Sequence, residues 1–124
     1  MIAYDTTFDP PAPILQVTVA NVLNRRWRLT LPAILDTAAD ITAIPEFVLH
    51  QIKAYPVSKI RIEGIDAQSN IIDTYRVQMV VAEQRISRLP VIPVNFEFVV
   101  LARDVLNQFV VHLDGPKLIF TIGQ

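Results

Sequence analysis

The chain is 124 residues long, carries 11 basic and 12 acidic residues, and contains no cysteine. This length fits one domain with its own hydrophobic core, and the lack of cysteine excludes disulfides, thiol nucleophiles and cysteine-ligated metals. The balanced charge does not favour a nucleic-acid partner. Neither a signal-peptide pattern nor an apolar run of ~18 residues occurs, so we expect a cytoplasmic protein with no membrane partner.

The first third of the sequence predicts an extended arm followed by a β-hairpin. Residues 1–13 contain three prolines and are expected to form an N-terminal arm without regular structure, ahead of one domain over residues 14–124. Residues 14–20 alternate apolar and polar side chains, as a half-buried strand does. Residues 27–31 alternate again after a turn and lead into residues 33–35, which we expect to be buried on both sides.

The turn between these strands carries the one basic–aromatic patch of the sequence, made by Arg25, Arg26, Trp27 and Arg28. A patch of this kind can bind nucleic acid, but a solvated turn explains it better in a chain of nearly neutral charge.

The middle of the sequence predicts a short helix and a long hairpin. Residues 45–52 begin with proline and space their apolar residues along one helical face. Residues 59–63 and 74–80 alternate strictly on either side of a polar stretch. This pattern predicts a hairpin over residues 58–82 whose tip lies near residues 65–70.

The last third predicts more strands and a second helix. Residues 91–94 and 96–101 have strand character, and residues 103–109 carry apolar side chains at helical spacing. An Asp-Gly-Pro turn joins residues 110–113 to residues 118–122 in a closing hairpin. Short strands at close spacing with two short helices predict an all-β protein, either a compact barrel or a sandwich.

Asp36 is the strongest candidate for a functional residue. Three apolar residues precede it, and small residues follow. The dipeptide Asp-Thr also occurs at Asp5 and Asp73, so only the context distinguishes Asp36. A purely structural explanation is a turn that ends a strand, in which the Asp36 carboxylate accepts backbone N–H groups.

Two segments carry a resemblance to a known family. Residues 35–42 read Leu-Asp-Thr-Ala-Ala-Asp-Ile-Thr, and residues 101–106 read Leu-Ala-Arg-Asp-Val-Leu. Over residues 14–122 the chain resembles the retropepsin-like (retroviral-type, clan AA) aspartic proteases, as a prokaryotic-type, single-domain member. The family's segments read Asp-Thr-Gly-Ala-Asp and Leu-Gly-Arg-Asp, so Ala38 and Ala102 stand where the family has glycine. The resemblance implies a small closed acid-protease β-barrel with one or two short helices.

The resemblance also implies a role for each residue of the candidate site. Asp36 would be the catalytic residue, in an active-site loop with Thr37 and Ala38. Ala39 and Asp40 would line the substrate groove, and an ion pair between Arg103 and Asp40, which we expect to be buried and bidentate, would fix the loop. The hairpin tip would act as a flap that closes over the substrate. Its residues are Gly64, Ile65, Asp66 and Ala67.

The implied function is that of an aspartic endopeptidase active as a homodimer, with one aspartate from each chain. Two carboxylates about 3 Å apart share one proton. The ionised member can deprotonate a water molecule while the protonated member donates to the scissile carbonyl oxygen. The expected partners are a second copy of the chain and a peptide or protein substrate. We expect no cofactor and no metal, because the two histidines, His50 and His112, lie far apart in the sequence and have no close carboxylate set.

The two alanines leave a second function open. If Ala38 or Ala102 needed a positive φ, each alanine would be strained by roughly 1–2 kcal/mol. The alternative function is therefore a catalytically weak or inactive module of the same fold that binds peptides or partner proteins and dimerises. A further alternative is an unrelated small β-barrel.

Overall fold

The computed structural model describes residues 1–63 and 68–124, and this part of the chain is built mainly of β-strands, as the sequence predicts. Two short helices, α1 (Glu46–Gln51) and α2 (Arg103–Leu106), interrupt the strands. The strands are β1 (Ile2–Ala3), β2 (Ile14–Asn21), β3 (Arg28–Leu35), β4 (Ala43–Pro45), β5 (Pro56–Glu63), β6 (Ser69–Val81), β7 (Gln84–Val94), β8 (Val99–Leu101), β9 (Val110–Asp114) and β10 (Ile119–Gly123).

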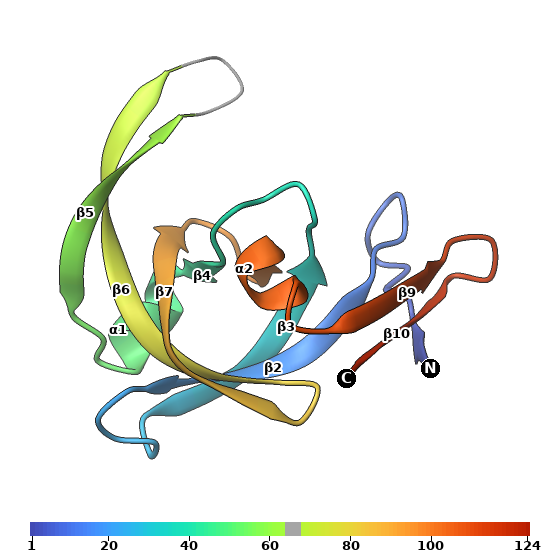
Figure 1. The fold of residues 1–124 in the computed structure, drawn as a ribbon, viewed down its shortest axis with the longest axis horizontal. Helices are drawn as coiled ribbons and strands as arrows, with labels where there is room; N and C mark the ends of the chain where they lie inside the picture. The colour runs from blue at the N-terminus through green and yellow to red at the C-terminus, as the bar shows by residue number, and fades with distance from the viewer. Residues whose placement is uncertain (64–67) are drawn as a thin grey trace.

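The main sheet closes into a barrel, which decides between the two predicted architectures. Its strands follow the order β2-β3-β8-β4-β7-β6-β5, and an additional pairing of β2 with β6 completes a ring. β5 pairs only with β6 and lies outside that ring, so the β5–β6 hairpin extends beyond the barrel (Figure 1). No helix in the described ranges is long and apolar enough to span a membrane.

Strand alternation fills the barrel. Leu15, Val17 and Val19 on β2 are buried, whereas Gln16 and Thr18 between them face outward. On β6, Val77, Met79 and Val81 are fully buried in the same cluster. Burying each such side chain contributes about 1.5–3 kcal/mol, and the core-facing residues of β2, β3, β6, β7 and β8 make up most of the cluster.

A second, three-stranded sheet joins the two ends of the chain. β1 pairs with β10, which pairs with β9, all antiparallel. The sequence predicted no regular element before residue 14, so β1 corrects that expectation. Pairing with β10 orders it, and the Tyr4 ring packs edge-on against buried Phe120 at 6.0 Å.

Three other boundaries and the burial of one residue differ from the prediction. β7 begins at Gln84 because it pairs with β6 directly after a two-residue turn. β8 is shorter than the predicted strand over residues 96–101 because Phe96 leaves the sheet to stack on Phe98 at 5.3 Å. α2 ends at Leu106, after which the amides of residues 108 and 109 bond three residues back and close turns. Ile34 is only half-buried, so residues 33–35 are not buried on both sides.

Candidate active site

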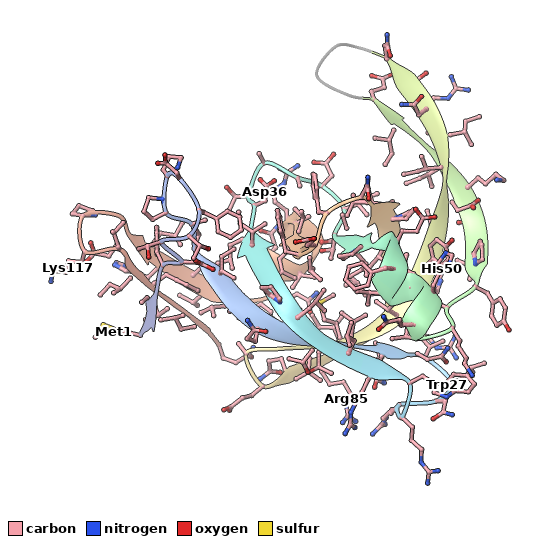
Figure 2. The ribbon with its side chains drawn as sticks, turned by 180° about the vertical axis from the view of Figure 1, so that it is seen from behind. Met1, Trp27, Asp36, His50, Arg85 and Lys117 are labelled. Carbon is pink, nitrogen blue, oxygen red and sulfur yellow. The ribbon has the colours of Figure 1, made fainter. Side chains whose placement is uncertain are left out.

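Asp36 follows the last residue of β3 and sits at the start of a loop on one end of the barrel (Figure 2). Its backbone N–H donates to the Leu101 carbonyl on β8 at 2.9 Å, which continues the β3–β8 pairing. Its carboxylate Oδ1 accepts the Ala38 N–H at 2.9 Å, and the Ala39 N–H bonds to the Asp36 carbonyl at 3.3 Å. The strand-ending turn is therefore present, and it holds a half-exposed carboxylate in one orientation.

Arg103 holds the same loop from α2. One guanidinium nitrogen, Nη1, donates to the Thr37 carbonyl at 2.8 Å, and Nη2 forms an ion pair with Asp40 Oδ1. The Arg103 backbone N–H donates to the Ala39 carbonyl at 3.0 Å. Three points of the loop are thus fixed by one residue that is distant in sequence.

The ion pair differs from the expectation in one respect. The side chains of Arg103 and Asp40 are 45% and 79% exposed in the single chain, so the pair is not buried. It is also not bidentate on the carboxylate, because the second arm of the guanidinium bonds to Thr37 instead. The pair therefore fixes geometry, and solvent screens most of its contribution to stability.

A second polar link between the two segments was missed by sequence reasoning. Thr42 is fully buried; its N–H and its hydroxyl donate to the two carboxylate oxygens of Asp104, at 3.0 and 2.6 Å. The Thr42 hydroxyl oxygen also accepts the N–H of Ala102 at 3.1 Å. The sequence offered one signal for this link, the positions of the two residues in the signature segments. Thr42 lies two residues after Asp40, and Asp104 lies one residue after Arg103.

Neither alanine of the signature segments has a positive φ. The non-glycine residues with positive φ in the described ranges are Lys53, Ala82, Glu83, Arg88 and Leu118. Ala102 is extended, with φ −94° and ψ −177°, and its methyl is fully buried. The strain considered for Ala38 and Ala102 is therefore absent, and each costs only the space of a methyl group.

A hollow of about 440 Å³ lies beside the loop, and we call it the groove hollow. Ala39 and Asp40, which the resemblance places in the substrate groove, line this hollow, whereas Asp36 does not. The rest of the lining is largely apolar. The lining residues are Ala38, Ala39, Asp40, Ile41, Ile60, Arg61, Ile62, Glu63 and Ile92.

The hairpin that forms one wall of the groove hollow pairs regularly from Ser58 to Glu63, after a shift of register between Pro56 and Ser58. Lys59 Nζ lies 2.9 Å from Asp73 Oδ1 across it, and this hydrogen bond, with the attraction between the charges, raises the pKa of Lys59. The predicted flap residues lie outside the described residues. They are Gly64, Ile65, Asp66 and Ala67.

Metal-ligating side chains do not gather anywhere in residues 1–63 and 68–124: no group of three or more histidine, aspartate or glutamate side chains could hold an ion. His50 lies on the exposed face of α1, 3.9 Å from Glu46, and His112 lies on β9.

No protein-family model and no curated protein matches this sequence. Solved structures do match. The protease of simian foamy virus (mac) superposes with a TM-score of 0.58 and 19% identity, over 77% of this chain and 92% of that one. A retropepsin-like aspartic protease from Rickettsia conorii gives a TM-score of 0.52 and 12% identity, over 90% of this chain and 93% of that one.

The EIAV protease, solved with the inhibitor HBY-793, gives a TM-score of 0.52 and 21% identity, over 78% of this chain and 86% of that one. These likenesses show the fold. The chain has the retropepsin-like fold, a closed β-barrel with two short helices, and the resemblance predicted from its two signature segments is confirmed at that level.

Proposed function

We propose that this chain, which has the fold of the retropepsin-like proteases, is an aspartic endopeptidase that works as a homodimer. The observation that carries the proposal is the placement of Asp36. Its carboxylate is half-exposed at the end of β3, in a loop held by β8 and by Arg103 beside the groove hollow. A carboxylate kept in a fixed and accessible position suits a reacting group.

A second chain would complete the chemistry. Asp36 Oδ1 is occupied by the Ala38 N–H, and no hydrogen bond to Oδ2 occurs within the described part of the chain. Oδ2 is therefore available to the Asp36 carboxylate of a second chain. The pair would share one proton, so that one member activates water and the other donates to the substrate carbonyl oxygen.

The groove hollow supports a peptide substrate. Isoleucines at positions 41, 60, 62 and 92 give it apolar walls, and Asp40 lies at its edge. A peptide side chain of apolar character would bury its surface there at roughly 25 cal/mol per Å². Ala39 and Asp40 would then act as substrate-binding residues, as the resemblance to the family implies.

The absence of a positive φ at Ala38 and Ala102 argues against one reason for an inactive module, backbone strain, and leaves the space of the added methyl groups as the other. With ordinary φ values at both positions, the loop needs no glycine to reach its conformation. The Ala38 methyl is exposed and leaves the backbone path of the loop unchanged.

A peptide-library digestion tests the proposal. The chain should cleave peptides, a pepstatin-type inhibitor should block cleavage, and activity should peak below neutral pH because the shared proton is lost as pH rises. Asp36→Asn should lower kcat by about 10²–10⁴-fold, since it removes the group that takes the proton from water.

Asp9→Asn, a change of the same size at an exposed aspartate of the N-terminal arm, is the matched control and should keep full activity. Sedimentation of the same sample should show a dimer at the concentrations that give activity. Equal activity of the two variants, or a flat profile between pH 4 and 8, would refute a carboxylate dyad.

A further inference from the structure

The outer face of the barrel carries a second hollow, of about 80 Å³, which we call the arginine pocket. The strand register builds it. Ala20 on β2 pairs with Arg28 on one side and with Gln78 on the other, and Val80, two residues further along β6, pairs with Arg85. The small, buried Ala20 leaves a depression, and the longer side chains of the neighbouring strands surround it. The lining residues are Thr18, Ala20, Arg25, Arg28, Gln78, Val80 and Arg85.

The third arginine comes from a turn that is held rigidly. Asn21 is buried; its side-chain nitrogen donates to the carbonyls of Ile52 and Lys53, at 2.9 and 3.1 Å. Its side-chain oxygen accepts the N–H groups of Leu23 and Asn24. The backbone of the turn that carries Arg25 is therefore anchored from inside the molecule, which keeps Arg25 beside the same hollow as Arg28 and Arg85.

Among the residues that the structure describes, no acidic side chain forms an ion pair with any of the three guanidinium groups. In the described ranges, the ion pairs are His50–Glu46, Lys59–Asp73 and Arg103–Asp40, and no side-chain hydrogen bond satisfies Arg25, Arg28 or Arg85. Three like charges around one small hollow repel one another, and this repulsion is relieved when an anion enters.

We propose that the arginine pocket binds the phosphate group of a small phosphorylated molecule. A phosphate offers several oxygens and up to two negative charges to several arginine forks, whereas a carboxylate offers two oxygens and one charge. The volume of the hollow is that of about two to three water molecules, which suits one phosphate group.

A neighbouring hollow of about 490 Å³ accommodates the rest of such a ligand. It shares Thr18 and Val80 with the arginine pocket and continues over Thr30 towards Ile14. The hydroxyls of Thr18 and Thr30 lie 2.8 Å apart on its floor and offer polar contacts, while Ile14 supplies apolar surface. This size lies in the usual range for small-molecule sites.

The site is separate from the candidate active site. In Figure 2, Arg85 and Trp27 lie at the end of the molecule away from Asp36, and Lys117 lies at a third corner. The arginine pocket can therefore stay open when two Asp36 loops meet, and its test does not depend on protease activity.

Titration with inorganic phosphate and with phenyl phosphate, each against chloride at equal ionic strength, tests the proposal by calorimetry and by amide chemical shifts. We expect saturable one-to-one binding and shifts at Ala20, Arg28 and Gln78, with phenyl phosphate the tighter ligand. Arg28→Gln and Arg85→Gln should each weaken binding about tenfold, the typical loss for a charge-assisted hydrogen bond.

Lys117→Gln is the matched control, because it removes one positive charge at a distant turn and should leave the affinity unchanged. If the control lost as much affinity as the arginine variants, binding would depend only on the net charge of the protein, and the proposal would be wrong. Amide chemical-shift changes that are identical in phosphate and in chloride would also contradict the proposal. Tighter binding of a short oligonucleotide than of phenyl phosphate would contradict a small-molecule ligand and identify the site as one for nucleic acid.

Discussion

The buried hydroxyl of Thr42 connects the two halves of the candidate site. It donates to Asp104 and accepts from the backbone of Ala102, so it ties the residues around β4 to the start of α2. Arg103, whose side chain bonds to the Asp36 loop, lies between Ala102 and Asp104 in sequence. A small change at Thr42 should therefore affect both stability and the position of Arg103.

Thr42→Val keeps the shape of the side chain but removes the hydroxyl. The Ala102 N–H is then buried without an acceptor and Asp104 loses a donor, so we expect a loss of about 1–3 kcal/mol in the free energy of unfolding. Urea denaturation measures it. Thr42→Ser should recover most of the loss, and Thr121→Val, on the exposed face of β10, should change stability by no more than about 0.5 kcal/mol. An equal loss in the Thr121 variant would contradict the role given to Thr42.

The β6–β7 hairpin contains backbone strain outside the candidate site. Ala82 and Glu83 form its two-residue turn, with φ 46° and 69°, between the paired residues Val81 and Gln84. Such turns match the twist of the strands but favour asparagine and glycine. The hairpin nevertheless forms because β6 and β7 pair along most of their length and bury Val77 and Leu89.

Glu83→Gly should raise the free energy of unfolding by roughly 0.5–1 kcal/mol. Relief of the left-handed conformation is worth about 1–2 kcal/mol, and the greater freedom of glycine in the unfolded chain offsets part of it. Thermal unfolding measures the change. Ser87→Gly, at a position of β7 with no positive φ, is the comparison and should lose about 0.5–1 kcal/mol. A destabilised Glu83 variant would show that strain in this turn is negligible.

At the scale of the whole molecule, the proposed chemistry needs two chains, because each supplies a single Asp36 loop. The chain pairs its own ends, β1 with β10, and leaves the Asp36 loop at one end of the barrel (Figure 2). The loop is thus accessible to a second copy of the chain. A dyad shared by two chains also predicts how activity falls when active and inactive chains are mixed.

Mixing equal amounts of the unmodified chain and Asp36→Asn, with time for subunits to exchange, should lower the activity to about one quarter. Random pairing makes about a quarter of the dimers fully intact, and a dimer with one aspartate has no dyad. Initial rates of peptide cleavage, with the total chain concentration held constant, measure the effect. A fall to about one half would mean that each chain works alone.

The sequence by itself determined the local features. Alternation predicted the strands of the first hairpin and of the long hairpin over residues 58–82, the apolar run placed Asp36 at a strand end, and the spacing of the apolar residues predicted α1. These features could be predicted because side-chain periodicity is set by neighbours within a few residues. The resemblance of two short segments then supplied the fold, which the solved structures confirm.

Only the tertiary structure decided which distant residues meet. The closure of β2 on β6 made the sheet a barrel, β1 was ordered by the other end of the chain, and Thr42 met Asp104 across the fold. The same is true of the unstrained backbone at Ala102 and of the convergence of Arg25, Arg28 and Arg85. The reason is physical: register and closure are set by the burial of the whole core, whereas the alternation of side chains along a strand depends only on neighbours a few residues apart.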